Sequence, residues 1–255
     1  MSLDLSGENF VRLEITNLVL YAYKTDGNYW IYDLEGISEL DCSENELRSL
    51  PTLPKTLIKL WCFRNQLQKL PDLPKSLKIL SCSENQLNEL PVLPETLDDL
   101  QCDNNHLYSL PTLPKTLTTL ICSCNNLQIL PELPGVLEEL DCAYNQFCEL
   151  PVLPTKLHTF QCCYNKLHSL PKLPETLKVF ECANNPLKFI PPLPDRPAQY
   201  YDVPKKLKDL HSVEHYPIYR RRYQSYRYLI TFLAYHAQVS PVIVANKHFW
   251  FPGEI

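Results

Sequence analysis

The sequence predicts a repeat solenoid, in which short parallel strands stack at intervals of 20 residues. One pattern recurs eight times over residues 37–196, and self-similarity at a fixed period is typical of solenoids. The composition agrees with this fold class, because the 255 residues include 23 prolines but only 5 glycines. A compact α/β enzyme usually needs more glycine for its turns and phosphate-binding loops.

The repeated unit has the form L-x-x-L-x-C-x-x-N-x-L-x-x-L-P-x-L-P-x-x. Apolar residues alternate around Leu40 and Cys42, which is the period of a short strand with one buried face. The two prolines exclude a helix in the second half, because each fixes φ and pushes the preceding residue to extended geometry. We therefore expect an extended, polyproline-like segment on the side of the unit opposite the strand.

The eight copies together supply enough apolar side chains for a continuous core. A single unit cannot bury its leucines, whereas stacked units can. At about 1.5–3 kcal/mol per buried side chain, such a set can hold a solenoid together. We name each set of equivalent positions, which recur every 20 residues, by its first member. Only Leu, Ile, Phe or Cys occupies the sets led by residues 37, 40, 42, 47, 50 and 53.

Asparagine also recurs every 20 residues, from Asn45 to Asn185. It lies where the chain leaves the predicted strand, and we expect its side chain to point inward. A buried amide must be hydrogen-bonded, and the free backbone groups of adjacent turns are its natural partners. The asparagines are therefore interpreted as structural and not catalytic.

Eight of the eleven cysteines follow the same step, from Cys42 to Cys182. Cysteines in a line, one per strand and about 4.8 Å apart, do not converge tetrahedrally on a metal ion. Parallel side chains also place their sulfurs poorly for disulfides. We interpret these residues as small inward hydrophobic groups and expect no metal and no cofactor. Cys163, outside this set, falls on the predicted concave face and is a candidate reactive thiol, although no neighbour in the sequence activates it.

The unit resembles a leucine-rich repeat in its 20-residue form. Its Leu-Pro-x-Leu-Pro segment is similar to the class found in bacterial type III-secreted effectors of the YopM and IpaH kind. The version with Leu-x-Cys-x-x-Asn is similar to leucine-rich-repeat proteins of giant viruses. The resemblance covers residues 37–196 and implies a horseshoe that binds proteins, in a pathogen or large virus that acts on proteins of its host. It implies no single function, because the fold is a generic scaffold.

The chain departs from IpaH-type effectors in the region that carries their ubiquitin-ligase activity. No cysteine follows Cys182, and no Cys-x-Asp motif occurs anywhere in the sequence. Ligase activity of that kind is therefore not expected. Searches for nucleotide-binding loops, zinc-protease motifs and nucleophile elbows also find nothing, so we expect a protein that is not an enzyme and takes no small-molecule substrate.

By the resemblance, the residues flanking the inward Leu and Cys point to the concave face, at positions led by 39, 41 and 43. Trp61 and Phe63 share this face, with Ile79 on the next strand, and exposed aromatic side chains beside charge typically anchor protein interfaces. The carboxylates on this face indicate a partner of basic or mixed charge. The alternatives are scattered apolar residues without a role and an acidic surface that serves solubility. The predicted partner-binding residues are Trp61, Phe63, Ile79, Asp99, Asp103, Ile121, Glu139 and Asp141.

The predicted repeats are flanked by two different segments. Residues 1–36 contain two aromatic and branched stretches, 18–23 and 28–32, joined through a hairpin turn at Thr25-Asp26-Gly27. We interpret the segment as a β cap for the first repeat; the alternative is an independent binding hairpin. Residues 197–255 hold 8 basic and 4 acidic residues, whereas residues 1–196 hold 16 basic and 25 acidic ones.

A helix near residues 217–237, opened by Pro217, is expected to cap the last repeat. Alternatively, Arg220, Arg221 and Arg222 form a docking site for a second protein or a surface for nucleic acid. The net charge of -5 argues against a general nucleic-acid binder.

These observations favour a non-enzymatic protein-interaction module that binds a host protein through the concave face. The alternative functions are an adaptor in ubiquitin transfer, whose basic tail recruits the machinery, and nucleic-acid binding through Arg220–Arg222. The N-terminus lacks a basic and then apolar stretch, so we expect no signal peptide. No apolar run reaches the length of a membrane span. We therefore expect a cytoplasmic protein, in the host cytosol if it is viral or effector-like, that is a monomer.

Overall fold

The fold is given by a computed structural model, which describes residues 1–188, 191 and 199–201. The chain divides into two units, Met1–His211 and Ser212–Ile255, and only the first contains described residues. The described part holds 13 strands, which form two sheets, and no helix. The helix expected near residues 217–237 lies outside the described residues.

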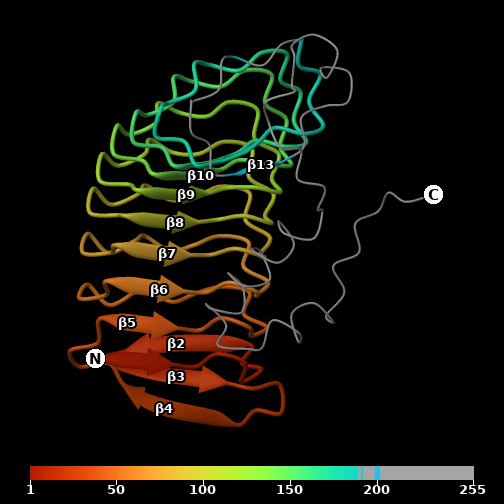
Figure 1. Cartoon of the computed structure of the whole chain (residues 1–255). Helices are drawn as coiled ribbons and strands as arrows, with labels where there is room; N and C mark the ends of the chain where they lie inside the picture. Colours follow the sequence, from red (N-terminus) through yellow and green to blue (C-terminus); the bar gives the residue numbers. More distant parts are fainter. Residues whose placement is uncertain (189–190, 192–198, 202–255) are drawn as a thin grey trace. The chain divides into compact units, whose positions relative to one another are not determined.

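The larger sheet has ten parallel strands, one from each repeat and one at each end (Figure 1). From β5 onward, each residue pairs with the residue 20 positions later, as Leu40 does with Leu60. This register is the one that the sequence spacing predicts. The strands, in sheet order, are β1 (Ser2–Asp4), β5 (Glu39–Asp41), β6 (Lys59–Trp61), β7 (Ile79–Ser81), β8 (Asp99–Gln101), β9 (Thr119–Ile121), β10 (Glu139–Asp141), β11 (Thr159–Gln161), β12 (Val179–Glu181) and β13 (Gln199–Tyr201).

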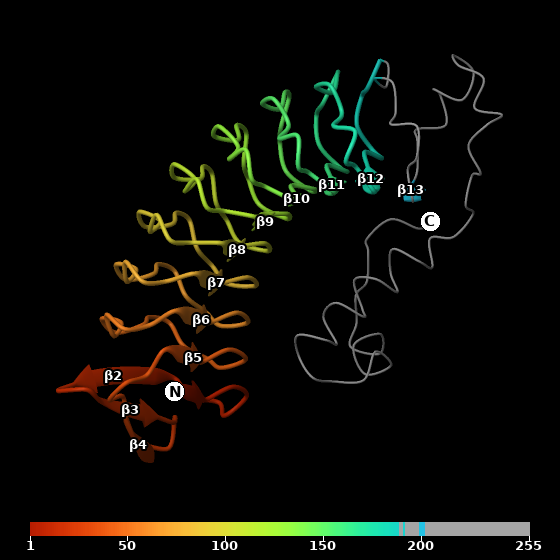
Figure 2. The ribbon, with the colours of Figure 1, turned by 60° about the vertical axis from the view of Figure 1, so that its left-hand side comes forward.

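Each repeat consists of a strand and a return segment on opposite sides of the stack (Figure 2). In the strands from β5 to β12 the middle residue is buried, and its two neighbours are half-buried except for the buried Ser81. The proline-containing return forms no strand or helix in the described repeats. It closes in a turn, in which the Leu57 N–H donates to the Pro54 carbonyl oxygen at 3.1 Å. Proline thus keeps the return free of ladder hydrogen bonds.

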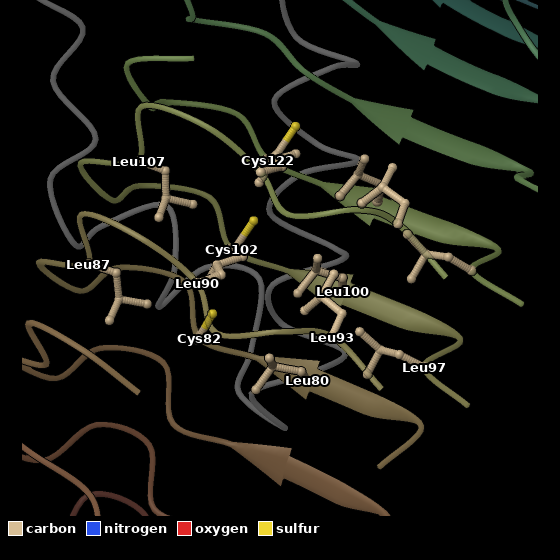
Figure 3. Close-up of a cluster of buried hydrophobic side chains, with 14 of the residues drawn as sticks. Leu80, Cys82, Leu87, Leu90, Leu93, Leu97, Leu100, Cys102, Leu107 and Cys122 are labelled. Atoms are coloured by element: carbon tan, nitrogen blue, oxygen red, sulfur yellow. The ribbon is translucent and has the colours of Figure 1, made fainter. Parts of the chain in front are cut away.

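The core is one continuous cluster that runs through all the repeats. The six predicted apolar positions are buried in every described repeat, apart from Leu73 and Leu150, which are half-buried and pack against the same cluster. Figure 3 shows leucine and cysteine side chains of neighbouring repeats, such as Cys82 and Cys102, in this interior. The prediction of a stacked apolar core is therefore confirmed.

The asparagine of each repeat is buried and hydrogen-bonded through both ends of its amide, as predicted. Asn105 is representative: its Nδ2 donates to the carbonyl oxygens of Cys82 at 3.0 Å and Cys102 at 3.2 Å. Its Oδ1 accepts the N–H of Leu87 at 2.9 Å. Because Cys82 and Leu87 belong to the preceding repeat, each asparagine links two neighbouring repeats. The same set of contacts recurs up to Asn185.

A second column of polar side chains, which the sequence analysis missed, links the return segments. The Thr96 hydroxyl lies 2.8 Å from two carbonyl oxygens, that of Lys75 at the end of the preceding repeat and that of Leu77 at the start of its own repeat. In the sequence, this column appears as Ser or Thr at the second residue after the Leu-Pro-x-Leu-Pro segment. Val136 and Lys156 occupy this position in two repeats and interrupt the column. Hydroxyl groups make these contacts at Thr56, Ser76, Thr96, Thr116 and Thr176.

The smaller sheet is antiparallel and lies beside the first repeat. It contains β2 (Arg12–Thr16), β3 (Val19–Tyr23) and β4 (Tyr29–Asp33), in that order. The two stretches expected to form a hairpin are β3 and β4, and β2 is an additional strand on the far side of β3. Leu13, Leu20 and Leu34 join the core of the repeats, so this sheet covers the end of the stack.

The first ten residues form a shortened copy of the repeat, which the sequence analysis did not recognise. Strand β1 pairs with β5, so that Leu3 lies beside Leu40. The Asn45 amide bonds to this copy as other asparagines bond to the repeat before them: its Nδ2 donates to the Leu5 carbonyl at 2.8 Å, and its Oδ1 accepts the Phe10 N–H at 2.7 Å. The copy stands 37 residues before its partner, and a search at a step of 20 therefore misses it.

At the other end, β13 continues the 20-residue register beyond the eight predicted repeats. Val179 pairs with Gln199, although the core pattern has ended: Asp202 and Lys205 stand where cysteine and asparagine would be expected. The sheet therefore extends one strand further than the repeated pattern predicts.

Replacing Asn105 with alanine is expected to lower the free energy of unfolding by about 2–5 kcal/mol. The substitution leaves the buried Leu87 N–H without its acceptor, which costs about 1–3 kcal/mol. It also removes one of the two amide donors to each of the Cys82 and Cys102 carbonyl oxygens, and each lost bond costs about 0.5–1.5 kcal/mol. Urea denaturation followed by circular dichroism measures the effect. Asn88→Ala, at an exposed position of the neighbouring repeat, is the control and should change little. A loss below about 1 kcal/mol for Asn105→Ala would show that the asparagines are dispensable.

Replacing Val136 with threonine is expected to stabilise the protein by about 0.5–1.5 kcal/mol. The half-buried Val136 interrupts the hydroxyl column, and threonine of nearly the same shape would bond the carbonyl oxygens of Lys115 and Leu117. Val152→Thr, at a position that is 86% exposed, is the matched control. Equal unfolding midpoints for Val136→Thr and the wild type would contradict the role assigned to the column.

Candidate partner-binding face

The predicted site residues lie on one surface, formed by the side chains that flank the buried position of each strand. We call this surface the strand face; it comprises the positions led by Glu39, Asp41 and Ser43. All the predicted residues are half-buried there. The first or last residue of a strand supplies Trp61, Ile79, Asp99, Ile121, Glu139 and Asp141, whereas Phe63 and Asp103 lie two residues after a strand.

Parallel, in-register pairing decides which of these side chains are neighbours. Trp61 lies beside Ser81, and Ile79 pairs with Lys59. Ile79 is therefore diagonal to Trp61, two residues back along the next strand. The ladder continues past the strand end, since the Glu44 N–H donates to the Phe63 carbonyl at 2.9 Å. Phe63 consequently remains part of the same face.

The end of the strand face near β6 combines aromatic groups with paired charges. The Lys59 Nζ lies 2.8 Å from a carboxylate oxygen of Glu39 and 5.7 Å from the centre of the Trp61 ring. Lys59, the one cation that the sequence places on this face, is thus already neutralised. Trp61 and Phe63 keep part of their surface open to solvent, beside a locally neutral ion pair.

Further along the sheet, the carboxylates have few compensating charges. Burial raises the pKa of Asp99 from 3.8 to about 6, although weak hydrogen bonds from Gln101, at 3.3 Å, lower it. The carboxylate of Glu139 contributes to the rise, and burial also raises the pKa of Glu139 itself. These side chains therefore exchange protons closer to neutral pH than ordinary carboxyl groups do.

Asp141 is the most perturbed carboxyl group of the strand face. It accepts hydrogen bonds from the Ala143 N–H at 3.0 Å and the Ser123 hydroxyl at 2.9 Å. Burial outweighs both bonds and raises its pKa from 3.8 to about 7, and Asp103 adds to the effect. Asp103 accepts from Ser83 and Asn104, yet burial raises its pKa as well. The face thus presents desolvated carboxylates that a cation would stabilise.

Next to this acidic part lies an aromatic pair that the sequence analysis missed. The rings of Tyr144 and Tyr164 stack with centres 4.2 Å apart and an angle of 12° between their planes. Tyr144 packs against a small apolar patch that contains Cys163. Both tyrosines occupy the position after those led by Ser43, where φ is positive, 52° and 53°. The sequence could have revealed this pair, because two tyrosines that are 20 residues apart lie next to each other in the stack.

The structure describes one of the two remaining candidates. Burial raises the pKa of the Cys163 thiol, and the nearby Glu181 carboxylate raises it further, which disfavours the reactive thiolate form. The arginines Arg220, Arg221 and Arg222 lie outside the described residues, and their docking role remains a prediction.

Comparison with solved structures identifies the class of protein. The chain is 35% identical to the structure described as a Shigella effector leucine-rich-repeat domain, with a TM-score of 0.55, and covers 72% of that domain with 60% of its own length. It is also similar to YopM from Yersinia enterocolitica WA-314, at 34% identity and a TM-score of 0.46, over 65% of this chain. A scan against protein-family models and a search of curated proteins gave no match.

Parallel strands at a step of 20 residues, joined by asparagines, define a solenoid of short repeats. The chain belongs to the leucine-rich-repeat proteins and resembles the Shigella effector domain of that family. It spans 46% of the length of the Yersinia enterocolitica YopM structure. In the part of the chain that the structure describes, no helix is long and apolar enough to cross a membrane.

Replacing Asp141 with asparagine is expected to stabilise the protein at pH 8 and to have little effect near pH 4. The folded-state pKa of about 7 lies above the ordinary 3.8, so the folded protein binds the extra proton and the wild type loses stability as the pH rises between these values. The Oδ1 of asparagine can still accept from the Ala143 N–H, and its Nδ2 can donate to the Ser123 hydroxyl oxygen, so asparagine avoids this cost. The expected gain at pH 8 is roughly 1–3 kcal/mol.

Urea denaturation at pH 4 and pH 8 measures this difference. Glu149→Gln, which removes an exposed carboxylate, is the matched control and should show no such pH dependence. An Asp141→Asn variant that is equally or less stable than the wild type at pH 8 would refute the role given to burial.

Proposed function

We propose that this chain is a non-enzymatic protein-interaction module, whose strand face binds a partner protein that presents basic side chains. The likeness to leucine-rich-repeat effectors supports a protein-interaction module in general. The choice of the strand face and of a basic partner rests on the chemistry of its side chains.

The observation that carries the proposal is the group of desolvated carboxylates around Asp99 and Asp141. Burial holds their pKa values at about 6 and about 7, which means that ionisation is costly while no cation is near. An arginine or lysine of a partner would provide the missing charge and favour the ionised form. Binding should therefore release protons and become tighter as the pH rises from about 5.5 to 7.5.

Trp61 and Phe63 supply an apolar anchor at the other end of the same face. Large aromatic groups that are only partly buried lose their remaining contact with water when a partner covers them, which typically accounts for much of the affinity of an interface. Lys59 and Glu39 neutralise each other beside Trp61, so this part of the face favours an apolar contact. The partner thus needs an apolar patch next to basic side chains.

The similar effector structure suggests where such a partner occurs. It is described as a Shigella effector leucine-rich-repeat domain, and by this likeness we propose a pathogen or viral protein that acts in the host cytosol on a host protein. The adaptor and nucleic-acid alternatives depend on the arginines of the tail, which lie outside the described residues, and no observation favours them.

The proposal predicts that a partner captured from a eukaryotic cell lysate is lost when the anchor is removed. The bait is the full chain, and the test variant is Trp61→Ala/Phe63→Ala, checked for an unchanged fold by circular dichroism. Val92→Ala/Val152→Ala is the matched control, because it removes two apolar side chains that are each 86% exposed and lie on the return segments. The captured proteins are identified by mass spectrometry.

We expect the wild type and the control to capture the same host protein, and the folded test variant to lose at least nine tenths of it (about 1.4 kcal/mol). Capture by the wild type should also weaken when the pH is lowered from 7.5 to 5.5. If the test variant captures the same proteins as the wild type, the strand face is not the binding surface, and Arg220–Arg222 become the residues to test.

A further inference from the structure

Strand β4 forms an open edge at the end of the three-stranded sheet. It pairs with β3 on one side only, and in Figure 1 it lies at the end of the repeat stack away from β5. Its sequence, Tyr29-Trp30-Ile31-Tyr32-Asp33, contains no lysine and no proline. Proteins usually protect exposed edges with such residues, because a free edge invites another strand.

The register shows which backbone groups of this edge are free. In an antiparallel pair, alternate residues direct both their N–H and C=O groups to the partner strand. The Lys24 N–H donates to the Asn28 carbonyl at 2.9 Å, and the Leu34 N–H donates to the Leu18 carbonyl at 2.7 Å. The even-numbered residues of β4 therefore face β3. The amide and carbonyl groups of Tyr29, Ile31 and Asp33 face outward, and no other described residue bonds to them.

The side chains of the same three residues also lie on an open surface. Tyr29 is 55% and Ile31 is 58% exposed, whereas Trp30, on the opposite face of the strand, contacts the ring of Phe10 edge-on at 5.6 Å. Two of the three residues that offer free backbone groups, Tyr29 and Ile31, therefore also offer apolar surface.

We propose that β4 pairs with β4 of a second copy of this chain, antiparallel about a two-fold axis at Ile31. In this register Ile31 lies opposite the partner's Ile31, and Tyr29 lies opposite the partner's Asp33. Tyr29, Ile31 and Asp33 each direct their N–H and C=O groups away from β3. The pairing therefore contains three hydrogen-bonded residue pairs, which form about six backbone hydrogen bonds between the copies. The two three-stranded sheets become one continuous sheet of two-fold symmetry.

The edge is self-complementary, and this favours a second copy over an unrelated strand. In a two-fold interface the same residues of both copies meet, so that every contact between one residue and another occurs twice. Here it matches apolar with apolar at Ile31 and a hydroxyl with a carboxylate at Tyr29 and Asp33, whereas equal charges never face each other directly. This proposal replaces the expectation of a monomer, and it is independent of the strand face, which belongs to the other sheet.

The test is sedimentation equilibrium of the full chain over a range of concentrations. The wild type should have a mass of about twice 29.6 kDa, and Ile31→Lys should have the mass of one chain, because two lysines would face each other across the axis. Thr16→Lys adds the same charge to an exposed position of β2, the opposite edge of the same sheet, and should remain a dimer. Circular dichroism confirms that all variants fold.

A charge-swap experiment separates two-fold pairing at Ile31 from any other association. Ile31→Lys and Ile31→Asp should each be monomeric alone and should form a mixed dimer when combined, because opposite charges then face each other. A monomeric wild type, or a dimer that Ile31→Lys leaves intact, would overturn the proposal. Failure of the two variants to combine would equally exclude this register.

Discussion

The fold depends on one side-chain amide per repeat. A strand of three residues makes too few ladder hydrogen bonds to fix the turn that follows it, and this turn is buried against its neighbours. The amide of Asn105 satisfies backbone groups of its own turn and of the repeat before it, so it sets both the turn and the spacing between repeats. Because every asparagine bonds to backbone groups of the preceding repeat, Asn45 in the first repeat also needs such groups before it. The shortened copy at residues 1–10 meets that need through Leu5 and Phe10.

With the turns fixed, the two sides of the solenoid can carry different residues. On the return side, proline removes backbone donors, and the hydroxyl column supplies the link between repeats that the missing donors would have made. On the strand side, only the middle residue must be apolar, so the positions flanking it are free to vary. Their variation along the stack, from aromatic groups at Trp61 to carboxylates at Asp99 and Asp141, is what makes the strand face a candidate interface.

The sequence alone predicts the repeats well, because each core position is occupied by one kind of residue at a constant step. It fails where that step changes: the shortened copy stands 37 residues before Leu40, and β13 follows a pattern that has lost its cysteine and asparagine. The site was predicted in part. Spacing places Asp141 on the strand face, but the rise of its pKa depends on how closely neighbouring strands pack around it. The outward direction of Tyr29, Ile31 and Asp33 depends on the register of the hairpin, which the turn sequence alone leaves open.

A row of residues with positive φ lies beside the strand face, and none of them is glycine. The residue before each asparagine has a positive φ, between 51° and 56°, a region that disfavours residues other than glycine and asparagine by about 1–2 kcal/mol. The row nevertheless contains large side chains. Arg64 bridges Glu44 and Glu84 at 3.0 Å, and Tyr144 stacks on Tyr164. The hydrogen bonds of the asparagine amides hold each turn in this conformation and offset its cost. The positive φ directs the charged and aromatic side chains of these residues along the border of the strand face. Backbone strain of this kind is often found at binding surfaces in folded proteins, which agrees with the proposal that the strand face binds a partner.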